Sequence, residues 1–135
     1  MTFGQIYYEK CNVDTVLKIQ KSGENIETDL ILKFLCSIDE VCSNSVEFSE
    51  LSNETLFNLI MLVPNKFLKV LNYKDVNSNH ILSILKSPIH DNIDLQKCYD
   101  NISSLDNSIP LRKEVLNSID AASKKLNVQL SSKKY

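Results

Sequence analysis

The sequence predicts an all-α fold: a single compact domain of about seven short antiparallel helices. Apolar residues recur at spacings of three and four along the chain, and the period-two alternation of β-strands is nearly absent. The length of 135 residues indicates one domain, and a hydrophobic content of 43% is enough for one buried core. The helical domain is expected over residues 1–126, followed by a polar, frayed tail over residues 127–135.

The first two helices are indicated by a stop signal and an apolar stripe. A helix that includes Asp14 to Ser22 is expected to end at Gly23, where a left-handed backbone conformation is favoured. The second helix is expected from about Asn25 to Cys42, with one apolar face toward the core. Its apolar stripe consists of Ile26, Leu30, Phe34, Ile38 and Val41.

The most apolar stretch, Thr55 to Tyr73, is predicted to be a buried pair of short helices. Ser52 is expected to cap the first, and Pro64 ends it because proline lacks a backbone donor and clashes with the preceding turn. The same proline suits the first turn of the next helix. The uncharged run in this stretch is eleven residues long, short of the roughly 20 that span a bilayer, so no membrane interaction is expected.

Three more helices are predicted in the second half. One is expected to begin with Ser78 as its cap and end near Pro88, and the next to open at Asp91 or Asn92. The last is expected to start within residues 108–110. Connections of about two to six residues favour antiparallel neighbours, and there is no fixed repeat period. The helices are therefore expected to form either an irregular HEAT-like stack or a helical bundle.

The residues that carry common enzyme chemistry are not arranged in a recognisable pattern. With only two glycines, the chain cannot form a glycine-rich phosphate loop. His80 and His90 are ten residues apart and there is no CxxC or HxxxH spacing, so no metal site is expected. Asp39 and Glu40 are adjacent and point in different directions on a helix, which does not suit acid–base catalysis. We therefore expect no enzyme activity and no cofactor.

The four cysteines are expected to be free, partly buried thiols, with two disulfides as the alternative. On one continuous helix Cys36 and Cys42 would lie about 120° apart around the axis and about 9 Å along it, too far to pair. They can pair only if the helix ends between them. The N-terminus lacks the pattern of a signal peptide, so a cytoplasmic location is expected, or a periplasmic one if a leader was removed.

Charge is distributed unevenly along the chain. Residues 1–60 contain ten acidic and four basic side chains, and residues 24–54 contain eight acidic side chains with Lys33 as the single base. Basic residues of the second half are dispersed, with one arginine, so nucleic-acid binding is not expected. The acidic region either attracts a basic protein partner or is an ordinary solvated helix face.

In its size, helical content, richness in Asn, Ser, Ile and Lys, and acidic bias, the chain resembles the small all-helical immunity proteins that bacteria pair with contact-dependent or secreted toxins. The resemblance implies a protein-binding inhibitor, monomeric when free, that neutralises a cognate toxin. The expected toxin is a nuclease whose basic active site is occluded by an acidic surface. The alternative is a helical scaffold or adaptor that binds other proteins.

The partner-binding surface is expected between residues 39 and 54, where five acidic residues surround a predicted loop. Phe48 is either an apolar anchor of this surface or a hydrophobic staple before the cap of the next helix. The predicted partner-binding residues are Asp39, Glu40, Glu47, Phe48, Glu50 and Glu54.

Overall fold

The computed structural model describes residues 10–90 and 92–131. These residues form seven α-helices and two 3-10 helices and contain no strand, which confirms the all-α prediction. None of the helices in this part combines the length and hydrophobicity needed to cross a membrane. The elements are α1 Val13–Ser22, η1 Gly23–Asn25, α2 Thr28–Ser37, η2 Glu40–Asn44, α3 Val46–Leu62, α4 Pro64–Leu71, α5 Ser78–Leu85, α6 Leu95–Ser103 and α7 Arg112–Lys125.

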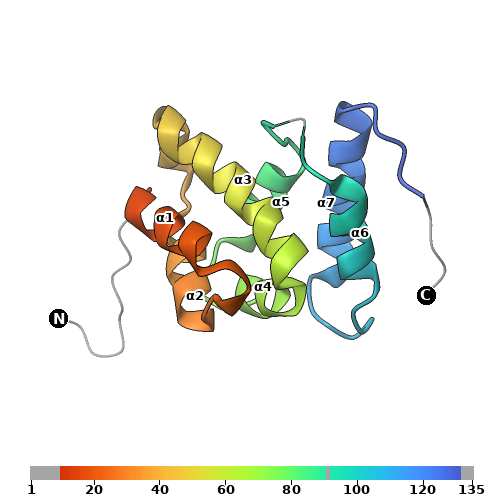
Figure 1. Cartoon of the computed structure of the whole chain (residues 1–135), viewed down its shortest axis with the longest axis horizontal. Coiled ribbons are helices and arrows are strands. Elements are labelled where there is room, and N and C mark those ends of the chain that lie inside the picture. The colour runs from red at the N-terminus through yellow and green to blue at the C-terminus, as the bar shows by residue number, and fades with distance from the viewer. Residues whose placement is uncertain (1–9, 91, 132–135) are drawn as a thin grey trace.

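The longest helix, α3, is the centre of the molecule. It crosses the middle of the view in Figure 1, with α1 and α2 on one side and α6 and α7 on the other. It packs against α1, α4, α5 and α6. These partners include helices that precede α3 and helices that follow it in the chain, an arrangement found both in an irregular HEAT-like stack and in a helical bundle. The core contains four fully buried phenylalanines, Phe34, Phe48, Phe57 and Phe67.

Two helix boundaries agree with the predictions because each depends on a single residue's backbone. Gly23 follows the last residue of α1 and has φ 60°, a left-handed conformation that glycine adopts without steric cost. Pro64 is the first residue of α4, and α3 ends two residues earlier at Leu62. The expected pair of helices on either side of this proline is therefore present, but the first of them is 17 residues long.

The predicted end of α2 at Cys42 is wrong, because the helix ends at Ser37. Ile38 has an extended backbone, and the carboxylate of Asp39 accepts a 3.0 Å hydrogen bond from the Val41 amide, which starts the separate 3-10 turn η2. An aspartate that caps a new turn competes with continuation of the helix. Val41, expected in the inward stripe, is consequently 56% exposed.

The predicted start of the next helix at Ser52 is also wrong, because Ser45 caps α3. Its side-chain oxygen accepts a 3.3 Å hydrogen bond from the Phe48 amide. Ser52 lies inside the helix, is buried, and donates its hydroxyl to the Ser49 carbonyl. Phe48 is therefore in the first turn of α3 and is not a staple residue that precedes the cap.

The last two helices also start later than expected. Asp94 caps α6 by accepting a 3.0 Å hydrogen bond from the Lys97 amide. The expected start at Asp91 lies outside the described residues, and Asn92 is in a turn. Residues 108–110 likewise belong to a turn, and α7 begins at Arg112. Before α6 and before α7, residues that were predicted to cap or start the helix belong instead to the preceding turn.

Part of the expected tail contacts the helical domain. The Val128 amide donates to the Ser123 carbonyl at 2.8 Å, and the Ser131 amide donates to Oε1 of Gln96 at 2.7 Å. Leu130 is half-buried against the core. Residues 127–131 are thus attached to α6 and α7, whereas the rest of the expected tail, residues 132–135, lies outside the described residues.

The prediction that all four cysteines are free is wrong for two of them. Cys11 and Cys42 form a disulfide with a Cα–Cα distance of 5.5 Å, while Cys36 and Cys98 are free. The early end of α2 allows this pairing: the Cys11 amide donates to the Ser37 carbonyl at 2.8 Å, which holds the segment before α1 beside η2. The disulfide therefore joins the start of α1 to the η2 turn.

Alkylation with iodoacetamide near pH 8 tests this assignment. Burial raises the pKa of the Cys36 thiol to about 11 and that of Cys98 to about 12, with smaller contributions from Asp75 and Asp94. Because the thiolate is the reactive form, both thiols are expected to react slowly in the folded protein. After denaturation without reductant, mass spectrometry should show alkylation at these two cysteines only. Modification of Cys11 or Cys42 before reduction would contradict the disulfide.

Candidate functional site

The acidic residues between positions 24 and 54 fall into separate groups. Glu24, Glu27 and Asp29 lie at or before the N-terminal end of α2, and Asp39 and Glu40 lie just after its C-terminal end. A ten-residue helix is about 15 Å long, so α2 keeps these groups apart. The acidic residues of segment 24–54 therefore do not form a single face.

Three of the predicted partner-binding residues do share a face. Successive residues of an α-helix are rotated by about 100°, so Glu47, Glu50 and Glu54 form one stripe along α3. Glu47 and Glu50 are exposed, and Glu54 is half-buried. We call these three residues the α3 acidic stripe.

The α3 acidic stripe makes no ion pair with a lysine, arginine or histidine within the described residues. The two ion pairs found there join Lys10 to Asp39 at 3.2 Å and Lys124 to Asp120 at 3.3 Å. Glutamates three and four residues apart on a helix repel one another, which costs about 0.2–0.5 kcal/mol per pair. The stripe is thus a concentration of negative charge, with two exposed glutamates and one half-buried glutamate and without a close ion-pair partner.

Asp39 is separate from the stripe and already has partners. Hydrogen bonding from the Val41 amide, together with the nearby Lys10 ammonium, lowers the pKa of the Asp39 carboxyl below its usual value. The Asp39 carboxylate therefore already accepts a hydrogen bond within the η2 region and forms an ion pair with Lys10. Glu40, the next residue, is exposed and makes no ion pair within the described part of the chain.

Phe48 is not an exposed anchor, and the prediction of that role is corrected. Its side chain is 1% exposed and belongs to the core, because Ser45 rather than Ser52 starts the helix and turns Phe48 inward. The exposed apolar residues nearby are Val41 in η2 and Val46 at the start of α3, which are 56% and 69% exposed. No periodicity rule would have selected them, since their exposure follows from the break after α2.

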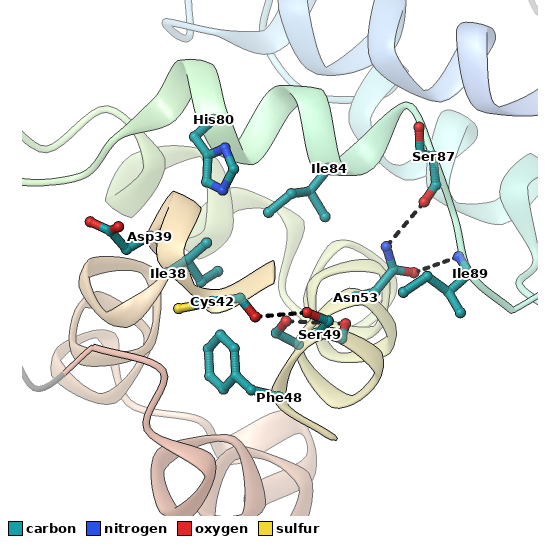
Figure 2. A pocket seen from close by; sticks show the side chains of 11 residues that line it. Ile38, Asp39, Cys42, Phe48, Ser49, Asn53, His80, Ile84, Ser87 and Ile89 are labelled. Atoms are coloured by element: carbon teal, nitrogen blue, oxygen red, sulfur yellow. Dashed lines mark hydrogen bonds between the residues drawn. The ribbon is translucent and has the colours of Figure 1, made fainter. Parts of the chain in front are cut away.

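A pocket with a volume of about 200 Å³ lies between η2, the first half of α3, α5 and the loop after α5. Figure 2 shows Ile84 of α5 facing Ile38, with Phe48 and the Cys42 sulfur on the opposite wall. Ile89, which lines it from the loop, is 53% exposed. The walls are therefore mainly apolar.

The polar side chains of the pocket are occupied by internal hydrogen bonds. Ser49 donates its hydroxyl to the Cys42 carbonyl at 3.0 Å. Asn53 donates to the Ser87 carbonyl at 3.3 Å and accepts from the Ile89 amide at 3.0 Å, as the dashed lines in Figure 2 show. In the described part of the chain no buried side-chain nitrogen or oxygen lacks a partner. These bonds fix the loop that closes one side of the pocket.

Catalytic and metal chemistry gains no support from this arrangement. His80 and Asp39 both line the pocket, but the hydroxyls of Ser49 and Ser52 donate to backbone carbonyls and not to the imidazole. Within the described ranges, no three His, Cys, Asp or Glu side chains are grouped so that they could hold a metal ion. What the region offers is an apolar pocket with acidic residues on neighbouring surfaces.

Comparisons with known proteins give no independent assignment. No protein-family model, no curated protein and no solved structure matches this chain.

Proposed function

We propose that this protein is a protein-binding inhibitor of the immunity-protein kind, which neutralises a cognate bacterial toxin. The toxin is a nuclease, and its basic active-site cleft is covered by the η2–α3 region of this chain. The observation that carries the proposal is the α3 acidic stripe, whose three carboxylates have no ion-pair partner within the described residues.

The stripe suits this role for an electrostatic reason. A nuclease cleft is built from lysine and arginine side chains that bind phosphates, and carboxylates on a rigid helix can bind the same groups. The mutual repulsion of Glu47, Glu50 and Glu54 is relieved when cations approach. Complementary fields also speed the encounter of the two proteins.

The disulfide bears on where this inhibition takes place. Disulfides persist in the periplasm and outside the cell and are rare in the cytosol. The Cys11–Cys42 bond therefore supports the periplasmic alternative over the cytoplasmic location expected from the sequence. Rapid alkylation of free thiols in intact cells, before lysis, tests whether the protein is in the periplasm or in the cytoplasm.

The function is tested by mixing the protein with the purified C-terminal domain encoded by the gene immediately upstream. We expect tight binding and protection of a nucleic-acid substrate from cleavage by that domain. The Glu50→Lys variant is expected to weaken binding about tenfold or more, because one favourable charge contact becomes repulsive.

The same substitution should leave folding intact, which separates binding from stability. The introduced lysine would lie one turn from both Glu47 and Glu54, so the free energy of unfolding is expected to stay unchanged or rise by a few tenths of a kcal/mol. Glu27→Lys makes the same charge change at the other end of α2 and serves as the control, with little effect on binding. No binding by the wild-type protein, or an equal loss in both variants, would contradict the proposed function.

A further inference from the structure

We propose that the Cys11–Cys42 disulfide is a redox-operated latch, which a dithiol reductant opens by attack on the sulfur of Cys11. Opening the latch releases the segment before α1 from η2, whereas Cys42 keeps its place in the core. The inference concerns the fold and does not rest on the proposed function.

The two cysteines of the disulfide differ in burial. Cys42 is 4% exposed and belongs to the core, whereas Cys11 is half-buried and packs at the edge of the core. The rate of thiol–disulfide exchange depends on access to the sulfur that is attacked. Because Cys11 is the more exposed of the two, the reductant reaches the Cys11 sulfur first, and Cys42 is the leaving group.

The exchange takes place in two steps. A thiolate of the reductant bonds to Sγ of Cys11 while the S–S bond breaks, and the electron pair of that bond leaves on Sγ of Cys42, which takes up a proton. The second thiolate of the reductant then attacks the reductant's own sulfur in the mixed disulfide, and Cys11 leaves and is protonated. The dithiol is thereby oxidised by two electrons to a cyclic disulfide, and the protein disulfide is reduced to two thiols.

Cys42 is held in η2 by hydrogen bonds that do not depend on the disulfide. Its amide donates to the Asp39 carbonyl at 2.9 Å, and its carbonyl accepts from the Ser45 amide at 2.9 Å and from the Ser49 hydroxyl at 3.0 Å (Figure 2). Its Sγ lies 3.6 Å from the Ser37 carbonyl oxygen, which is an acceptor for the thiol that reduction creates. Reduction therefore leaves Cys42 in place.

The backbone of Cys11 is strained, which favours its release once the cross-link is broken. Its φ is 57°, in the left-handed region where the Cβ of any residue other than glycine is crowded. Such a conformation persists only where the surroundings enforce it. Apart from the disulfide, this segment is held by the bond from the Cys11 amide to the Ser37 carbonyl and by the ion pair of Asp39 with the exposed Lys10. Surface ion pairs contribute little, so the segment is free to leave.

A matched pair of variants tests the difference between the two cysteines. In Cys42→Ser, the Cys11 thiol should form a mixed disulfide with oxidised glutathione near pH 8 about tenfold or more faster than the Cys42 thiol does in Cys11→Ser. Peptide mapping by mass spectrometry follows each cysteine separately, with Cys36 and Cys98 as internal references. In denaturant the thiols of Cys11 and Cys42 should react at similar rates.

Backbone relaxation of the wild-type chain, measured by NMR, tests whether the release is local. In dithiothreitol the amide order parameter of Cys11 is expected to fall below about 0.6, while that of Cys42 stays near about 0.85. The Val115 amide in α7, on the other side of α3 in Figure 1, is the control and should also stay near about 0.85. In the oxidised protein all three amides should be rigid.

Each outcome decides for or against the latch. Equal reactivity of the two thiols in the folded variants, or an unchanged order parameter at Cys11 after reduction, would overturn it. If Cys11→Ser unfolds, the wild-type order parameters still decide, because they need no substitution. Loss of order at Cys42 in the reduced protein would also overturn the inference, since Cys42 would not have kept its place. No measurement here uses the toxin domain, so failure of the latch and failure of the proposed function are distinguishable.

Discussion

Replacement of Cys11 by serine is expected to lower the free energy of unfolding of the oxidised protein by about 3–4 kcal/mol. The disulfide closes a loop between residues 31 positions apart, and the main effect of such a cross-link is to restrict the unfolded chain. A domain of this size has a total stability of about 5–15 kcal/mol, so the loss is a large fraction of the whole. Urea unfolding followed by circular dichroism measures it.

Two controls define the result for Cys11→Ser. The wild-type protein in dithiothreitol should unfold at nearly the same urea concentration as the variant, because both lack the cross-link. Cys36→Ser, which changes a free and half-buried thiol, should differ much less from the oxidised wild type. If Cys11→Ser matched the oxidised wild type, the two cysteines would not be bonded in solution.

The second large effect is expected for Phe48→Ala, which should lower the free energy of unfolding by about 3–5 kcal/mol. The ring is 1% exposed and lies in the first turn of the central helix, so its removal leaves a cavity among residues that cannot fully collapse around it. Thermal or urea unfolding provides the measurement. The same variant should also enlarge the pocket that Phe48 lines.

Val46→Ala is the matched control for Phe48→Ala. It removes apolar atoms two residues earlier on the same helix, but the side chain is 69% exposed, so the change in the free energy of unfolding should stay within about 0.5 kcal/mol. A small effect of Phe48→Ala and a large loss of partner binding would restore Phe48 as an exposed anchor. We expect instead that Phe48→Ala strongly lowers the free energy of unfolding.

The local features of the fold were predictable because they depend on one or two residues. Gly23 adopts a positive φ at the end of α1, and Pro64 starts α4 because its missing amide needs no partner in a first turn. The apolar periodicity indicated helices throughout, and the described residues contain no strand. The number and the type of the helices followed from these signals.

Helix starts were less predictable because several residues in a row could serve as caps. Ser45, Ser49 and Ser52 are all good candidates by type, and only Ser45 has a side-chain oxygen that accepts from the amide three residues later. The choice depends on which register buries Phe48. For the same reason the start of α6 was predicted too early, at Asp91 or Asn92. The cap is Asp94, and the helix begins at the next residue.

The helical class, the stops at Gly23 and Pro64, and the concentration of acidic residues follow from the amino-acid sequence alone, because they are properties of composition and short-range backbone preference. Packing in three dimensions selects which acids share a face, pairs Cys11 with Cys42, and buries Phe48 while it exposes Val41. These outcomes depend on the end of α2 at Ser37, after which the chain turns back against the segment before α1. A contact between residues about 30 positions apart is fixed by packing around α3, and no local pattern encodes it.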